Sequence, residues 1–238
     1  MSIAFFDLDK TLLAENSAQL WLKTLWSNRD INLAHMLHAS YWLAKYHLGF
    51  TKMDEVIEKG LALLEGESSE DVLNKTHDFF SDTIKRLYRP GAIEAIRSHQ
   101  QLGHTVSLLT STFDGLSVLV QKDLGLDYCL CTRLEIDDKG LFTGKTIGPP
   151  CFGPNKVIFA EQLALDLKVS LRECTFYTDS ASDMPLMNLV GRPVAVNPDP
   201  HLRARAQLKG WEIVDWGKPE WLLKKTKESK FTGKKLRL

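Results

Sequence analysis

Two carboxylates one residue apart, Asp7 and Asp9, follow the apolar run of residues 3–6. A short apolar run that ends in polar residues is typical of a buried strand in a parallel sheet. Ligands bind beyond the carboxyl ends of such strands, so we expect both acids at the mouth of a site. Two close carboxylates repel each other, and a hard divalent cation would hold them together. The alternative interpretation is a strand-end loop whose acids face water.

Three later segments carry groups that would complete the same chemistry. Thr110 follows the mostly apolar residues 106–109, and a hydroxyl beside free N–H groups at a strand-to-helix turn suits a phosphate oxygen. Lys156 opens an expected helix, where the helix dipole disfavours a cation, so it needs an anionic partner. Asp179 and Asp183 follow another apolar run, and two acids separated by small residues suit a magnesium site built from oxygen ligands.

Each of these residues has a simpler interpretation when it is taken alone. Thr110 would form an ordinary turn through its hydroxyl, and Lys156 would be a solvated lysine. The interpretation as a site depends on all four segments occurring in order along the chain. Each of them ends a strand or begins a helix at the same edge of the expected sheet.

The elements that would position these residues alternate along the chain from residue 90 onward. Helices are expected at 92–102, 117–124 and 155–167, and strands at 105–110, 174–178 and 193–196. This alternation predicts βαβ units, and therefore an α/β fold with a Rossmann-like, doubly wound and mostly parallel sheet. Residues 129–136 and 141–147 flank the polar residues 137–140, a pattern that predicts a hairpin.

Residues 14 to about 89 differ in composition from the rest, with few glycines and no proline. Apolar residues recur there at helical spacing, as at Leu20, Trp21 and Leu25. The segment is too long for the single helix that usually follows the first strand, so we expect a separate, all-helical cap. The predicted parts are a Rossmann-like catalytic core of residues 1–13 and 90–222, a helical cap of residues 14–89, and a basic tail of residues 223–238.

The composition narrows the class of protein. The 30 Lys and Arg residues balance the 30 Asp and Glu residues, so the charge gives no sign of nucleic-acid binding. No apolar run is long enough to span a bilayer, and we expect no secretory leader before the first strand. The chain has four cysteines: Cys129, Cys131, Cys151 and Cys174. We expect them to be reduced thiols in a cytoplasmic protein, and the alternative is that they bind zinc.

Together the four segments resemble the motifs of the haloacid dehalogenase superfamily. The residues that fit those motifs, in order, are Asp7 with Asp9 and Thr11, then Thr110, then Lys156, and then Asp179 with Asp183. The resemblance covers nearly all of residues 1–222. It is to the phosphoserine-phosphatase-like branch (subfamily IB), which has a helical cap after the first strand, and within it to histidinol-phosphatase-like and generic phosphatase members.

The resemblance implies a role for each acid. Asp7 would be the nucleophile that forms an aspartyl-phosphate, and Asp9 would protonate the leaving alcohol and then activate water. Mg²⁺ would be held by Asp7, Asp179 and the backbone carbonyl of Asp9. Asp183 would orient Lys156 or a water molecule on the metal. Because Asp9 is retained, a phosphatase or phosphotransferase fits better than a dehalogenase.

The same resemblance implies which residues would bind the substrate. Thr110, Ser111 and Lys156 would hold the phosphoryl oxygens. Related phosphoserine enzymes carry a glutamate shortly after the first motif, where this chain has Glu15 and Asn16. We expect these two residues to contact the leaving group, which favours an amino-alcohol phosphate such as histidinol phosphate or phosphoserine. Four cap aromatics would either line a pocket for a ring or form the cap core: Trp21, Trp26, Tyr41 and Trp42.

Three functions remain open at this point. The first is hydrolysis of a small phosphorylated metabolite, and the second is transfer of the phosphoryl group to an acceptor alcohol through the same intermediate. The third is a non-catalytic protein at a membrane surface, supported by the seven basic residues and one acidic residue of the tail 224–238. The sequence does not indicate an oligomeric state.

Overall fold

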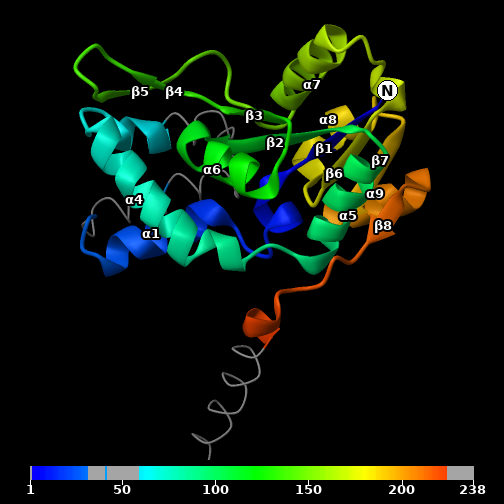
Figure 1. Cartoon of the computed structure of the whole chain (residues 1–238), viewed down its shortest axis with the longest axis horizontal. Coiled ribbons are helices and arrows are strands. Elements are labelled where there is room, and N and C mark those ends of the chain that lie inside the picture. Colours follow the sequence, from blue (N-terminus) through cyan, green and yellow to red (C-terminus); the bar gives the residue numbers. More distant parts are fainter. Residues whose placement is uncertain (1, 32–40, 42–58, 224–238) are drawn as a thin grey trace, which may run out of the picture.

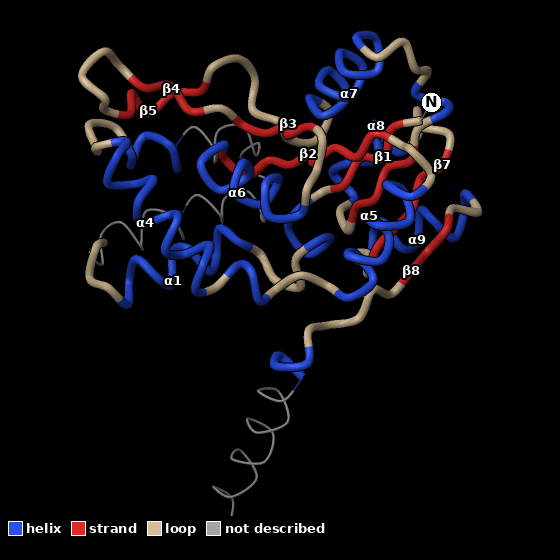
Figure 2. Tube along the Cα trace, in the orientation of Figure 1, coloured by secondary structure: helices blue, strands red, loops and turns tan. Residues whose placement is uncertain are grey.

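The computed structural model describes residues 2–31, 41 and 59–223 (Figures 1 and 2). Six strands form one sheet in the order β3-β2-β1-β6-β7-β8. Every neighbouring pair in this sheet is parallel, and the chain reverses its direction of winding at β1. The doubly wound α/β fold is therefore confirmed. The strands are β1 (Ile3–Phe6), β2 (Thr105–Phe113), β3 (Tyr128–Thr132), β6 (Thr175–Thr178), β7 (Arg192–Val196) and β8 (Glu212–Val214).

Helices cover both faces of this sheet, which is why β1 and β6 are buried along their whole length. Phe6 of β1 lies in the core that contains residues of α5 and α6, whereas Phe5 lies in the core that contains residues of α7 and α9. All four residues of β1 are fully buried. The helices are α5 (Pro90–Gln101), α6 (Asp114–Leu124), α7 (Asn155–Asp166), α8 (Met184–Met187) and α9 (Pro200–Lys209).

The described residues between β1 and α5 form helices and turns, with two isolated β-bridges. The longer helices are α1 (Ser17–Ser27) and α4 (Ser69–Asp82), which lie together at one end of the molecule (Figure 1). The ring of Trp21 contacts that of Phe79 edge-on at 5.1 Å and so joins these two helices. Trp42 and two stretches of the expected all-helical cap, residues 32–40 and 42–58, lie outside the described residues. The division into core and cap stays a prediction.

The predicted hairpin needs a correction. Residues 129–136 are not one hairpin strand, because β3 pairs in parallel with the free edge of β2. Only β4 (Leu134–Ile136) and β5 (Phe142–Thr146) form the antiparallel hairpin. The first half of the run joins the large sheet since Cys129 and Leu130 pack against its two cores.

The hairpin of β4 and β5 lies against the segment that begins α4 (Figure 2). The backbone N–H of Gly66 donates to the carbonyl of Phe142 at 2.9 Å, and the N–H of Phe142 donates to Glu67 at 3.0 Å. The N–H of Ser69 donates to Gly140 at 2.9 Å. Three backbone hydrogen bonds thus attach the hairpin to the start of α4.

A second correction concerns β2, which continues to Phe113 instead of ending at Thr110. Its pairing with β3 shifts in register between Leu109 and Phe113. Thr110, Ser111 and Thr112 therefore lie in an irregular part of the strand, not in a turn after it.

Candidate active site

The carboxyl ends of three neighbouring strands carry the candidate residues. Phe6 of β1 lies beside Leu108 of β2 and Tyr177 of β6. Asp7 follows directly, and its backbone N–H donates to the carbonyl of Tyr177 at 3.0 Å. Thr110 and Asp179 stand a short distance further along the flanking strands, so the fold brings residues that are far apart in sequence to one edge of the sheet.

The turn after β1 has an unusual backbone. Residues Leu8–Leu12 form a single wide turn in which Lys10 adopts the left-handed conformation, with φ of 58°. Leu8 and Leu12 are buried under the turn, whereas Lys10 is exposed. This geometry anchors the turn in the core on both sides of Asp9.

Lys156 lies at the centre of the site and is 3% exposed. Its Nζ lies 2.7 Å from Oδ1 of Asp7 and 2.8 Å from Oδ2 of Asp183. Burial disfavours the charged ammonium, but the facing carboxylates of Asp183 and Asp7 outweigh it and raise the pKa of Lys156. The lysine in the first turn of α7 therefore has the anionic partners that its position requires.

The two acids of the first motif differ in exposure, because Asp7 is buried and Asp9 is half-buried. Burial raises the pKa of Asp7; the charge of Lys156 lowers that pKa again, and Asp183 adds to the increase. Oδ1 of Asp9 accepts the backbone N–H of Ser17 at 2.6 Å, and Oδ2 accepts the hydroxyl of Thr112 at 3.3 Å. Burial raises the pKa of Asp9 against these two hydrogen bonds.

The acids after β6 differ in their partners. Oδ2 of Asp183 accepts the hydroxyl of Thr178 at 2.7 Å as well as Lys156. Its Oδ1 is buried and has no hydrogen-bond partner among the described residues. Burial raises the pKa of Asp179 to about 8, with repulsion from Asp7 adding to the increase. The repulsion between these carboxyl groups is what a bound cation would relieve.

This donor set fits a hard cation. A buried carboxylate oxygen without a partner is costly unless something positive faces it, and Oδ1 of Asp183 is such an atom. In the part of the chain that the structure describes, no group of three His, Cys, Asp or Glu side chains is arranged to hold a metal ion by itself. The oxygen donors that could hold such a cation are the carboxylates of Asp7, Asp179 and Asp183, the carbonyl of Asp9 and water, and Mg²⁺ prefers oxygen donors.

The cysteines offer no rival metal site. All four are free thiols, and three of them are buried. Within the described ranges they form no metal-binding group, so nothing there supports the zinc alternative.

The four residues expected to bind substrate differ in how far they are buried. Thr110 is buried, and its Oγ1 accepts the backbone N–H of Thr112 at 3.2 Å; Ser111 is half-buried beside it. Oδ1 of Asn16 accepts the N–H of Gln19 at 2.9 Å and caps α1. Glu15 is half-buried in the preceding position.

Three contacts of the site were not predicted from the sequence. They come from Ser17, Thr112 and Thr178, which bind carboxylates of Asp9 and Asp183. Thr178 directly precedes Asp179, which is a usable signal. Ser17 contributes a backbone N–H, so no side-chain pattern could have identified it.

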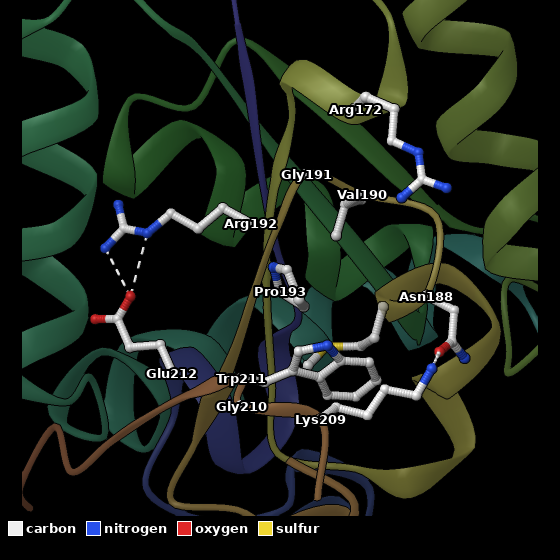
Figure 3. Close-up of a pocket in the computed structure, with 11 residues that line it drawn as sticks. Arg172, Asn188, Val190, Gly191, Arg192, Pro193, Lys209, Gly210, Trp211 and Glu212 are labelled. Carbon is white, nitrogen blue, oxygen red and sulfur yellow. Dashed lines mark hydrogen bonds and ion pairs between the residues drawn. The ribbon is translucent and has the colours of Figure 1, made fainter. Parts of the chain in front are cut away.

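The hollow drawn in Figure 3 lies at the opposite edge of the sheet, where β7 and β8 begin. There Arg192 pairs with Glu212 at 2.9 Å, and Lys209 donates to Asn188 at 2.9 Å. None of the candidate catalytic residues lines it.

Comparisons with known proteins identify the family of the chain. A family model described as haloacid dehalogenase-like hydrolase matches residues 4–188. A phosphoserine phosphatase of Mycobacterium tuberculosis is 34% identical over 90% of this chain and 70% of its own length. A histidinol-phosphatase of Neisseria meningitidis serogroup C is 29% identical over 90% of this chain and 99% of its own.

Solved structures show the same fold. A Bordetella pertussis protein described as having unknown function has a TM-score of 0.83 and 29% identity, over 91% of this chain and 99% of that one. A phosphoserine phosphatase with a phospho-aspartyl intermediate analogue has a TM-score of 0.66 and 21% identity, over 94% and 97%. No helix in the described ranges is long and apolar enough to cross a membrane.

Proposed function

The chain belongs to the haloacid dehalogenase-like hydrolases and is a phosphoric monoester hydrolase, and from this premise we propose how it acts. It hydrolyses a small phosphorylated metabolite with Mg²⁺, through a phosphoryl group carried on Asp7. The observation that carries the proposal is the buried ammonium of Lys156, which lies 2.7 Å from Asp7 and 2.8 Å from Asp183.

In the first step a carboxylate oxygen of Asp7 attacks phosphorus, and the bond from phosphorus to the leaving oxygen breaks. Lys156 holds Asp7 ionised and in place, since a charge-assisted hydrogen bond joins them. Asp9 gives its proton to the leaving oxygen. Burial raises the pKa of Asp9, which favours the protonated form that this step needs.

In the second step water attacks the phosphorus of the aspartyl-phosphate, and Asp9 takes the proton of that water. Asp7 is released as the carboxylate together with inorganic phosphate. The N–H of Ser17 and the hydroxyl of Thr112 fix both oxygens of Asp9, so the same group can serve in both steps. When bound, Mg²⁺ supplies charge stabilisation for the transferring phosphoryl group.

The phosphoryl oxygens are bound by Lys156, Thr110 and the neighbouring Ser111. Support comes from the contact of Lys156 with Asp7, which follows β1, and from the position of Thr110 and Ser111 in the irregular part of β2. Lys156 carries the positive charge that an anionic substrate needs.

The leaving group is an amino alcohol, with histidinol phosphate as the first substrate to test and phosphoserine as the second. The Neisseria relative named histidinol-phosphatase aligns over 99% of its own length, whereas the phosphoserine phosphatase of Mycobacterium tuberculosis aligns over 70%. Glu15, two residues before the first residue of α1, supplies the negative charge that an amine would find.

The test uses the purified full chain with Mg²⁺ and a panel of phosphomonoesters. The panel holds histidinol phosphate, phosphoserine, sugar phosphates and lysophosphatidate, each with and without an acceptor alcohol. We expect release of inorganic phosphate, fastest from amine-bearing substrates. Phosphoryl transfer to the acceptor as the main product would show a phosphotransferase instead, and no turnover of any substrate would refute the proposal.

A further inference from the structure

Two buried side chains with a permanent positive charge occur among the described residues, Lys156 and Arg89. Lys156 has two carboxylate partners. Arg89 is 5% exposed, yet no carboxylate forms an ion pair with it in the described ranges. A guanidinium without an ion pair is costly to bury, so this arrangement calls for an explanation.

Arg89 uses its guanidinium to hold two backbone carbonyls. Its Nε donates to the carbonyl of Lys10 at 3.1 Å, and its Nη1 donates to the carbonyl of Gly217. Lys10 belongs to the turn that carries Asp9, and it has a positive φ of 58°. A non-glycine residue in that conformation is strained and persists only when neighbouring groups hold it.

The backbone of Arg89 lies where the chain returns to the sheet. Its N–H donates to the carbonyl of Leu12 at 2.9 Å, and the N–H of Ala14 donates to Leu87 at 2.8 Å. The segment that leaves β1 and the segment that returns to α5 therefore run side by side at this point. A shift of Arg89 would move the same stretch of chain that follows Asp9.

The segment after β8 is fastened to the same place (Figure 1). The N–H of Gly91 donates to the carbonyl of Trp216 at 3.2 Å, and Nε1 of Trp221 donates to the carbonyl of Arg86 at 2.5 Å. Together with the bond from Arg89 to Gly217, these contacts make residues 216–221 a fixed support.

The guanidinium stays cationic because an arginine side chain is not deprotonated in proteins. Burial lowers the pKa of Arg89, while the carboxylates of Asp215, Asp179 and Glu15 raise it. One of these, Asp179, belongs to the candidate site. The side chain thus lies within electrostatic reach of the catalytic carboxylates without pairing with any of them.

We propose that Arg89 is a positioning residue for phosphoryl transfer, one that fixes the turn of Asp9 and Lys10 by tying it to the support formed by residues 216–221. Arg89 touches neither substrate nor metal in this role. The inference rests on the proposed function, because it assigns Arg89 to a turn whose acids perform the reaction.

The test compares Arg89→Lys with Arg86→Lys. Lysine keeps the charge but lacks the planar fork, so it cannot hold both carbonyls in the same geometry. Arg86 is exposed, and the same substitution there is the matched control. The readouts are kcat and KM for alkyl phosphomonoesters, histidinol phosphate and phosphoserine, whose leaving groups need the proton of Asp9, with saturating Mg²⁺, together with the melting temperature of each variant.

We expect Arg89→Lys to lower kcat by about 10- to 100-fold, as misplacement of catalytic groups does, with KM within about threefold of wild type because phosphate binding is untouched. Arg86→Lys should match wild type. The loss must persist at temperatures well below the melting point of the variant. If it vanishes there, or if kcat is unchanged, the role of Arg89 is structural and the proposal is wrong.

Two further comparisons separate the possible failures. Should Arg89→Lys not fold, Arg89→Gln, which can still donate to one carbonyl, takes its place with the same expected loss of kcat. Should the wild type itself release no phosphate from any substrate, the proposed function has failed. An active wild type with an unaffected Arg89 variant refutes this inference alone.

Discussion

The ammonium of Lys156 lies 2.7 Å from the carboxylate of Asp7, and both side chains are buried. One comes from the first turn of α7 and the other from the end of β1, 149 residues apart in sequence. Taking both charges out of water is costly, so removing one partner leaves a buried charge uncompensated. The site is thus part of what holds the sheet edge together, and variants must be compared for both stability and rate.

Replacement of the nucleophile should end the reaction. Asp7→Asn keeps the shape of the side chain but removes the attacking charge, so we expect no turnover and no phosphoenzyme. Intact-protein mass spectrometry after rapid acid quenching would detect the added phosphoryl group in wild type. Asp138→Asn, on the exposed hairpin turn, should behave as wild type. Wild-type rates in Asp7→Asn would contradict the assignment.

Replacement of Asp9 should have an effect that depends on the leaving group. Asp9→Asn cannot supply a proton, so alkyl phosphates should lose activity far more than activated aryl phosphates, whose leaving group needs no proton. The measurement is kcat/KM across a series of leaving-group pKa values. An equal loss across the whole series would mean that Asp9 is not the acid of the first step.

Loss of the lysine should destabilise the protein. Lys156→Met leaves Asp7 and Asp183 buried and unpaired, which should lower the free energy of unfolding by about 3–5 kcal/mol. Urea denaturation measures this change, with Lys122→Met on the exposed face of α6 as control. Equal stability of Lys156→Met and wild type would show that the carboxylates find other partners.

Removal of metal should abolish activity reversibly. EDTA should stop turnover and Mg²⁺ should restore it, because the donors at the site are oxygen atoms and favour a hard cation over zinc. Phosphate release in buffer depleted of divalent cations measures the effect. Full activity under those conditions would refute a role for Mg²⁺.

The residues after the first motif should distinguish substrates by their charge. Glu15→Gln should lower kcat/KM for histidinol phosphate more than for a sugar phosphate, because it removes a negative charge near the leaving group. Asn16 needs a different design, since Asn16→Ala also removes the cap of α1, worth about 1 kcal/mol. Asn16→Ser keeps a capping oxygen while removing the amide. Equal losses on amine-bearing and amine-free substrates would place specificity elsewhere.

The part of the fold that could be predicted from sequence is the part that local pattern controls. The buried strand before Asp7 was predictable because its residues face two cores, and α6 was predictable because Gly125 ends it in the left-handed conformation. The first half of residues 129–136 was not, because an apolar run pairs with whichever edge is free, and that edge belongs to distant β2.

The candidate site divides in the same way. A charged side chain directly after a buried strand or in the first turn of a helix is unusual, so Asp7 and Lys156 could be proposed from their neighbours in sequence. The contact from Thr112 to Asp9 depends on the register between β1 and β2. The contact from Arg89 to Lys10 depends on how a chain of more than 70 residues returns to the sheet, and no local pattern encodes that.

The attachment of the hairpin to the start of α4 bears on how such enzymes can diverge. Its three hydrogen bonds join backbone groups, so they do not depend on which side chains residues 66–69 and 140–142 carry. Substitutions at these positions can therefore accumulate while the attachment survives. Insertions or a proline at Gly66, Ser69 or Phe142 would remove a donor or shift the pairing. This attachment therefore constrains the length and the backbone of the two segments more than the identity of their side chains.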